Sequence, residues 1–282
     1  MHTSNLTLLK KHPGSFLLRM MVYVSALLTA GVVGFLIGYI LWQGVPNLTL
    51  PGLFDWEYNS QNQSMMPAII NTIIMTALTL LLAVPVGVFA AIYLVEYATR
   101  GNKLVKVIRI TAETLSGIPT IVYGLFGFIV FVITLGWSYT LLSGVITLAI
   151  MILPLIIRTT EEALMAVPDS YREGSFGLGA GKLRTVFRII LPSAMPGILS
   201  GVILSIGRIV GESAALIFTA GTNPVAAKSL FASASTLTVH MYALMTEGLH
   251  TEQAYAVAVV LLAVVILINA LSAFLAKKLT AR

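Results

Sequence analysis

The chain has 282 residues and a formal net charge of +6, and 57% of its residues are hydrophobic whereas only 10% are charged. This composition excludes an ordinary soluble domain and is typical of an integral membrane protein. Cysteine is absent and the four histidines lack carboxylates at ligand spacing, so we expect neither a disulfide framework nor a metal site.

Apolar runs long enough to cross a bilayer recur along the chain. The first extends from about Leu17 to Leu41, and we interpret it as an uncleaved helix, because a signal peptide has a shorter apolar core and a small-residue cleavage site. A polar segment from Trp42 to about Pro67 follows, and its aromatic residues suit a membrane interface. The second run, about Ile69 to Leu94, contains Pro85, where a kink is expected.

The third run extends from about Leu115 to Leu135 and the fourth from about Leu141 to Ile157. A fifth runs from Pro196 to about Ala220, and a polar segment separates it from the last, about Ala254 to Ala276. We therefore predict an all-α polytopic membrane protein with six transmembrane helices in one permease-like domain, residues 1–282. Small residues favour close helix contacts in membranes, and we expect such contacts at Gly31, Gly34, Gly38, Gly197 and Gly201.

A charged island of 35 residues, Arg158–Pro192, lies between the fourth and fifth runs. A segment this polar cannot lie in hydrocarbon, so we predict a surface loop. Ser170 and Glu173 form an S-x-x-E capping box, which predicts the start of a short helix. Several glycines, from Gly174 to Gly181, then weaken and end that helix. A short, poorly covered helix of this kind suits the groove of another protein.

The basic residues predict the orientation of the chain. Of the 17 lysines and arginines, all except Arg208 and Lys228 fall on one side of the predicted membrane. That side carries both termini and the charged island, and the positive-inside rule places it in the cytoplasm. Because these residues cluster at the ends of apolar runs, the positive charge does not indicate a nucleic-acid partner.

Arg208 and Glu212 stand near the middle of the fifth run, where a charge costs about 2.5 to 3.5 kcal/mol on insertion scales. At i and i+4 they would share one helix face. Two interpretations remain open: they pair with each other, or they line an anion path. A guanidinium presents a fork of donors that matches a tetrahedral oxyanion. Glu212 would then hold the arginine or accept a hydrogen bond from a protonated oxyanion, which would favour phosphate over sulfate.

The start of the third run, Ser116 to Thr120, reads S-G-I-P-T. Gly117 and Pro119 are poor residues for a helix interior, and a membrane tolerates free backbone groups only beside a cavity or within protein. Ser116 and Thr120 could therefore offer hydroxyls to an anion. A buried helix break satisfied by its neighbours is the alternative.

The stretch Gly177–Lys182 looks at first like a phosphate-binding loop. Phe176 stands where that motif needs its first glycine, and Leu183 stands where Ser or Thr would coordinate magnesium. The chain is therefore not expected to hold its own ATPase site, and no catalytic residue or cofactor is predicted in it.

Part of the charged island resembles the E-A-A-x-x-x-G-x9-I-x-L-P loop of bacterial ABC importer permeases. Glu173, Gly179 and the run Ile189–Pro192 keep its spacing, while Gly174 and Ser175 replace its two alanines. In that family the loop forms the coupling helix, which docks onto the cytoplasmic ATPase. The resemblance implies that ATPase coupling involves Asp169, Arg172, Glu173, Gly179, Ile189, Leu191 and Pro192.

A second resemblance is to the phosphate permease subunits of the PstA type. Arg208 to Ala214, R-I-V-G-E-S-A, is similar to their R-A-x-G-E-T-A signature, and Pro85 to Ala98, Ser116 to Gly127 and Leu237 to Leu262 are similar to the same subfamily. The resemblance covers roughly residues 66–275 and implies the type I ABC importer permease (MetI-like) fold. Together with the hydroxyls, it implies a substrate path at Arg208, Glu212, Ser116 and Thr120.

The resemblance implies the permease subunit of an ATP-driven phosphate importer in the bacterial cytoplasmic membrane. Its partners would be a homologous permease of the PstC type, a dimeric ATPase of the PstB type that binds the ATP and magnesium, and an extracytoplasmic phosphate-binding protein of the PstS type. A permease for another oxyanion, such as sulfate or molybdate, is an alternative. A secondary transporter driven by an ion gradient and a role in signalling phosphate status are further alternatives.

Overall fold

The computed structural model describes residues 13–280 except 50, 60, 100 and 249, and the described residues form helices and connecting segments without strands. Five helices are long and apolar enough to cross a membrane, and a sixth span results if one bent pair of helices counts as one. The all-α membrane prediction is therefore confirmed. The elements are α2 (Pro13–Gly44), η1 (Pro46–Thr49), α3 (Met66–Ile92), η2 (Tyr93–Tyr97), α4 (Lys103–Ser116), α5 (Thr120–Gly127), η3 (Phe128–Thr134), α6 (Leu141–Met165), α7 (Asp169–Gly177), α8 (Lys182–Thr185), η4 (Val186–Ile190), α9 (Leu191–Val210), α10 (Ala214–Thr219), α11 (Leu237–Glu247) and α12 (Thr251–Thr280).

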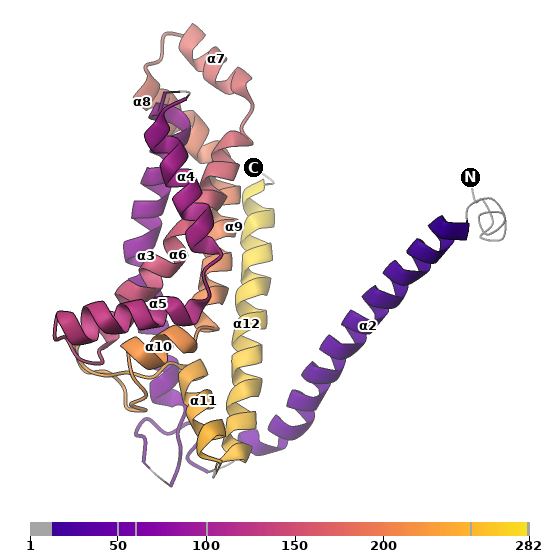
Figure 1. The fold of residues 1–282 in the computed structure, drawn as a ribbon, viewed down its shortest axis with the longest axis vertical. Coiled ribbons are helices and arrows are strands. Elements are labelled where there is room, and N and C mark those ends of the chain that lie inside the picture. Colours follow the sequence, from indigo (N-terminus) through magenta and orange to yellow (C-terminus); the bar gives the residue numbers. More distant parts are fainter. Residues whose placement is uncertain (1–12, 50, 60, 100, 249, 281–282) are drawn as a thin grey trace.

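The helix α6 is the centre of the bundle and packs against both α3 and α9 (Figure 1). Small residues allow this close packing. A Cβ at Gly87 of α3 would lie 2.6 Å from Ile156, and one at Gly197 of α9 would lie 2.7 Å from the Cβ of Ala163. Gly201 similarly faces Thr159, so the helix contacts predicted at Gly197 and Gly201 are confirmed.

The first helix, α2, departs from the rest of the bundle (Figure 1). Its apolar span is 0% buried, and it meets α12 near its Gly44 end, where Tyr39 lies edge-on to Tyr255. The helix contacts predicted at its glycines are wrong within the described chain, since nothing lies within 4 Å of a Cβ built at Gly31, Gly34 or Gly38.

The predicted third span is broken rather than continuous. Leu115 belongs to the end of α4, and the axes of α4 and of the following helical segment, Thr120–Thr134, differ by 103°. Pro119 explains the break, because proline lacks an N–H and disfavours helical geometry in the residue before it. The predicted start of this span at Leu115 is therefore wrong, although a break within the S-G-I-P-T stretch was expected.

The predicted fifth span is displaced toward the N-terminus. It begins at Lys182 rather than Pro196, and it ends at Val210 rather than Ala220. The π-helical segment η4 ends at Ile190, two residues before Pro192, and its wider turn makes room for a proline ring that would otherwise clash with the preceding turn. α3 likewise runs on through Pro85.

The charged island is less of a loop than predicted. Its first residues, Arg158 to Met165, continue α6, and Arg158 pairs there with Glu162 at 3.0 Å on the surface. Its last residues, from Lys182 on, begin the next span. The end of the bundle that carries α7, here called the α7 end, also receives the C-terminal end of α12, whereas α10 and α11 lie toward the opposite end (Figure 1).

Candidate functional site

Arg208 lies half-buried in the last turn of α9. The predicted helical spacing between Arg208 and Glu212 is wrong, because the helix ends at Val210. The ion pairs found in the described part of the chain do not join these two residues. The first alternative, a direct pair, is therefore not what the structure forms.

Glu212 instead serves the short helix that follows. Its side chain is buried, and its Oε1 accepts a hydrogen bond of 3.0 Å from the backbone N–H of Ala215. The end of α9 is satisfied from a distant segment, since the hydroxyl of Thr238 donates to the Val210 carbonyl at 2.5 Å. Sequence reasoning missed Thr238, because a threonine within an apolar stretch carries no charge signal.

The corner between α4 and α5 satisfies most of its own polar groups. The hydroxyl of Ser116 donates to the Glu113 carbonyl at 2.7 Å. The backbone N–H groups of Gly117 and Ile118 donate to carbonyls within the last turn of α4. Thr120 lies half-buried at the first position of α5. The anion-binding roles of Ser116 and Thr120 stay predictions.

Tyr123 and Gly124 of α5 bring the two helix breaks together. The Tyr123 hydroxyl donates to the Leu115 carbonyl at 2.8 Å, and the Tyr123 side chain belongs to the same buried cluster as Ile209, the residue after Arg208. A Cβ at Gly124 would lie only 2.7 Å from the Cα of Ala215, so the backbones of α5 and α10 are in direct contact. Among the described residues no carboxylate forms an ion pair with Arg208. A half-buried guanidinium of this kind, placed beside interrupted helices, can meet an anion within the membrane span.

The second region of interest is the exposed helix α7. It begins at Asp169, after Pro168, without a side-chain cap. The predicted capping box is therefore wrong, since Ser170 already lies inside the helix. Proline pre-sets the backbone angle before the first turn, and an acidic residue there complements the helix dipole. The Glu173 side chain is exposed, and its contact with an ATPase stays a prediction.

Of the glycines that were expected to weaken and end α7, Gly174 and Gly177 lie within the helix and Gly179 ends it. The φ of Gly179, +78°, lies in the left-handed region that favours glycine. The N–H of Gly179 donates to the Phe176 carbonyl at 2.9 Å, and the N–H of Ala180 donates to the Ser175 carbonyl at 3.1 Å. This pair of bonds is a Schellman motif, which closes the last turn of a helix.

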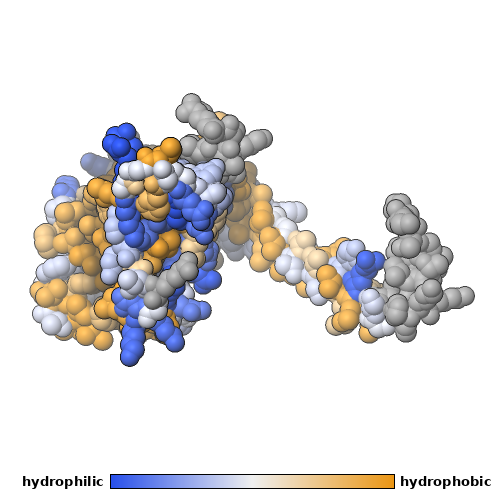
Figure 2. Space-filling model, turned by 90° about the horizontal axis from the view of Figure 1, so that it is seen from above, coloured by the Kyte–Doolittle hydropathy of each residue, from blue (hydrophilic) through white to orange (hydrophobic). Residues whose placement is uncertain are grey.

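Large apolar side chains are exposed around α7 and α8. The view onto this end of the molecule shows hydrophobic and hydrophilic residues side by side (Figure 2). The most exposed is Leu178, at 91%. Exposed large apolar side chains that gather near charged residues are typical of an interaction site. We call this group the tip patch: Tyr171, Phe176, Leu178, Leu183 and Phe187.

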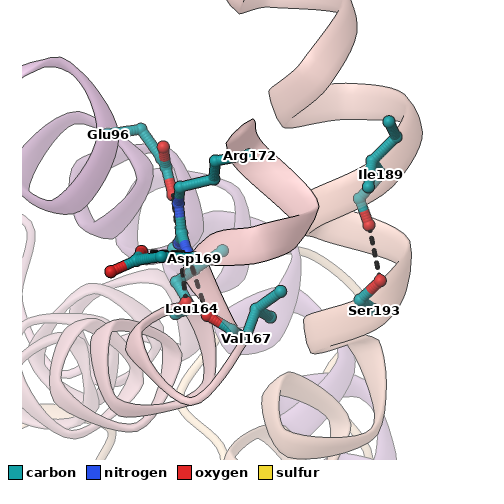
Figure 3. A network of polar contacts seen from close by, with 7 residues as sticks. All are labelled: Glu96, Leu164, Val167, Asp169, Arg172, Ile189 and Ser193. Atoms are coloured by element: carbon teal, nitrogen blue, oxygen red, sulfur yellow. Dashed lines mark hydrogen bonds and ion pairs between the residues drawn. The ribbon is translucent and has the colours of Figure 1, made fainter. Parts of the chain in front are cut away.

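The I-x-L-P residues, Ile189–Pro192, follow the tip patch in the chain. Ile189 and Leu191 pack against a buried apolar cluster formed by α3, α6 and α9, while Pro192 is exposed. The hydroxyl of Ser193 donates to the Ile189 carbonyl at 2.7 Å (Figure 3). Ile189 and Leu191 thus hold the base of the loop, and their part in coupling stays a prediction.

Arg172 is the most connected side chain of the α7 end (Figure 3). Its Nε and Nη2 donate to Oε1 of Glu96 at 3.1 and 2.7 Å. Nη1 donates to the Val167 carbonyl at 2.9 Å and to Oδ1 of Asp169 at 3.1 Å, and Nη2 donates to the Leu164 carbonyl at 3.0 Å. Arg172 thereby joins α7, the end of α6 and η2.

A cavity of about 720 Å³ lies beside this network, between η2, α4 and α7. Glu96, Glu113, Lys106 and Arg172 are among its lining residues. Because both signs of charge line it, the cavity does not select an anion.

The described residues form an all-helical bundle with an exposed, charged segment around α7, an architecture compatible with a transport permease. Residues 83–282 match the family described as "Binding-protein-dependent transport system inner membrane component". The chain belongs to this family, the MetI-like permeases of ABC importers, whose members are multi-pass transport subunits.

Two relatives illustrate the similarity. The chain is 35% identical over 245 residues to the "Probable ABC transporter permease protein YqgI" of Bacillus subtilis, covering 80% of this chain and 81% of that protein. It is 41% identical over 154 residues to the "Phosphate transport system permease protein PstA 1" of Mycobacterium tuberculosis H37Rv, covering 55% of this chain and 49% of that protein. The second match thus spans about half of the mycobacterial protein.

Solved structures support the fold. A bacterial alginate ABC transporter in complex with its alginate-bound periplasmic protein matches with a TM-score of 0.64 at 16% identity, over 93% of this chain and 96% of that chain. The MetNI methionine ABC transporter, in inward-facing form, matches with a TM-score of 0.59 at 20% identity, over 76% of this chain and 94% of that chain.

Proposed function

We propose that this chain is the permease subunit of an ATP-driven phosphate importer of the bacterial cytoplasmic membrane. The observation that carries the proposal is Arg208, half-buried where α9 is interrupted and not paired with Glu212. Relatives that carry the name PstA, at 37% to 41% identity, support phosphate as the oxyanion. Both chain termini and the tip patch lie in the cytoplasm, as the distribution of basic residues favours.

In this proposal, partner proteins hydrolyse ATP, deliver phosphate and complete the translocation path. A dimeric ATPase that binds ATP and magnesium docks on the tip patch and on Glu173, and an extracytoplasmic protein delivers phosphate. A homologous permease completes the path, and the exposed apolar side chains of α4, Leu104, Val107 and Ile110, are suited to contact it. ATP-driven closure of the ATPase moves the α7 regions and switches the side from which Arg208 is reached.

Selection of phosphate over sulfate rests on the neighbourhood of Arg208. The guanidinium attracts both anions, because each is a tetrahedral oxyanion. Phosphate carries a proton at neutral pH and sulfate does not. One oxygen of Glu212 is committed to Ala215, and its other oxygen is available as an acceptor for that proton. An acceptor that phosphate can satisfy and sulfate cannot favours phosphate at this position.

The test is uptake by the purified complex in lipid vesicles. We expect ATP-dependent uptake of labelled phosphate that excess unlabelled phosphate abolishes and excess sulfate or molybdate does not. Stronger competition by sulfate or molybdate would instead make this a permease for that oxyanion. Full uptake without ATP, driven by an ion gradient, would identify a secondary transporter. A signalling role would be separate if an Arg208→Ala variant lost transport but still reported phosphate status.

A further inference from the structure

The helix α3 is fastened by buried polar contacts at both of its ends. At the α7 end it continues into the π-helical segment η2, where the Glu96 side chain is only 8% exposed. This carboxylate receives two hydrogen bonds from Arg172. A buried, doubly bonded ion pair holds its two elements in one fixed geometry.

Arg172 has no donor left for any other partner. A guanidinium has five N–H groups, and the five hydrogen bonds of Arg172 go to Glu96, Asp169 and two carbonyls of the α6 end. The side chain therefore has no N–H group left to offer an ATPase or a ligand in this structure. It is a positioning residue, which fixes α7 to α3 and α6.

The segment that connects α7 to α8, together with these two helices, is here called the α7–α8 loop. Its α8 side also contacts η2. Nζ of Lys182, at the start of α8, lies 5.0 Å from the centre of the Tyr97 ring, a cation–π contact. The α7 and α8 sides are also joined to each other, because the buried hydroxyls of Ser175 and Thr185 lie 2.8 Å apart. The α7–α8 loop is thus fixed at both sides to η2.

At the opposite end, α3 holds the segment that connects α10 to α11. Asn71, which is fully buried, donates to the carbonyls of Val225 and Ser235, both at 3.1 Å, and accepts from the N–H of Ala227 at 2.9 Å. The neighbouring Thr72 hydroxyl accepts from the N–H of Leu237 at 2.8 Å. The connecting segment, residues 221–236, is here called the outer loop.

We infer that α3 is the rod that carries ATPase-driven movement of the α7–α8 loop to the outer loop. Its 27 residues span about 40 Å at 1.5 Å per residue. Arg172–Glu96 is the attachment at one end, and Asn71 is the attachment at the other. Close packing of α3 on α6 at Gly87 restricts bending of α3, because the two helices are in direct contact there. The inference rests on the proposed function, because the movement originates in an ATPase.

The absence of cysteine from the chain makes the movement measurable. A Ser229→Cys substitution places one thiol at an exposed position of the outer loop. In the full complex in lipid vesicles, maleimide labelling of this thiol is followed with and without ATP plus vanadate. We expect the labelling rate to change several-fold when nucleotide is trapped.

Breaking either attachment should remove this response. In Arg172→Lys and in Asn71→Ala we expect the nucleotide-dependent change to fall about tenfold, because a multiply bonded buried group is lost, while the ATPase still co-purifies and hydrolyses ATP. A merely structural role would lower assembly and hydrolysis together. If Arg172→Lys does not assemble, the milder Glu96→Gln tests the same attachment.

Two control variants should keep the response. Arg158→Gln breaks an ion pair whose partners are both exposed, at 62% and 59%, and Thr79→Val alters the middle of α3, where the buried hydroxyl has no hydrogen-bond partner in the described chain. The inference that α3 transmits the movement would be wrong if both Arg172→Lys and Asn71→Ala kept the full labelling response. It would also be wrong if a transporting wild-type complex showed no response. Absence of ATP-dependent uptake in the wild type would instead count against the proposed function.

Discussion

Two arginines of this chain, Arg172 and Arg208, occupy opposite kinds of site. Every donor of Arg172 is bonded within the chain, to the Glu96 carboxylate, which is 8% exposed, to Asp169, and to carbonyls at the end of α6. Arg208 lies in an apolar span, and the carboxylate nearest to it in sequence, Glu212, is engaged with Ala215. A guanidinium that is saturated holds structure in place, whereas one that is not can act on a substrate.

We expect the largest effect, a loss of phosphate uptake, from substitution of the unsaturated arginine, Arg208. Arg208→Ala should reduce phosphate uptake about 100-fold and Arg208→Lys about tenfold, because lysine keeps the charge but lacks the planar fork. Uptake at equal complex concentration in vesicles measures both. Arg158→Lys, on an exposed pair, is the matched control. Normal uptake by Arg208→Lys would mean that charge alone matters.

The contact between α5 and α10 decides whether the Arg208 region keeps its shape. Gly124→Ala places a Cβ 2.7 Å from the Cα of Ala215, and overpacking against backbone costs about 1–3 kcal/mol. We expect a lower melting temperature and reduced uptake. Gly117→Ala serves as the control, since its nearest neighbour would lie at an ordinary 3.5 Å. Equal stability of the two variants would contradict the contact.

The corresponding test at the α7 end concerns the helix stop. Gly179→Ala forces alanine into a left-handed conformation at φ +78°, which costs about 1–2 kcal/mol, and should weaken ATPase association. Gly181→Ala should be neutral, because its φ is −74° and nothing lies within 4 Å of its Cβ. Co-purification of the ATPase with each variant distinguishes them. If equal amounts of ATPase co-purified with both variants, the conformation of Gly179 would not matter for docking.

The smallest expected effect involves a buried group at the opposite end. Burial lowers the pKa of His240 below its ordinary 6.5, and its Nε2 has no hydrogen-bond partner among the described residues. The unfolded chain therefore takes up the proton first, so stability should fall as the pH drops below about 6.5. Melting temperatures between pH 7.5 and pH 5 should show a smaller slope in His240→Gln than in the wild type. An unchanged slope would assign the pH dependence elsewhere.

The sequence predicted those features that depend on local composition. Apolar runs mark helices because a bilayer requires about 20 apolar residues, and Gly179 ends α7 because its backbone conformation favours glycine. The class of transporter followed from the resemblance of the charged island to the coupling loop of ABC importer permeases. The same local logic misplaced the start of α7, since the preceding Pro168 sets the first turn without a side-chain cap.

The features that sequence did not reveal depend on residues far apart in the chain. Arg172 and Glu96 are 76 positions apart, and the carbonyl at the end of α9 is satisfied by a hydroxyl 28 positions away. The helix break after Val210 was missed because a single glycine and an apolar context are compatible with a continuous helix. The partner that stabilises the break, Thr238, can be identified only once α11 is in place.

The isolation of α2 from the bundle bears on how the chain enters a membrane. A span that touches little of its own protein derives its stability from the hydrocarbon around it, and such a helix can insert before the remaining segments have been synthesised. Insertion of α2 and folding of the bundle are then separate events, with separate free energies. Damage to the packing around α6 would therefore leave an anchored but unfolded chain, rather than one released into solution.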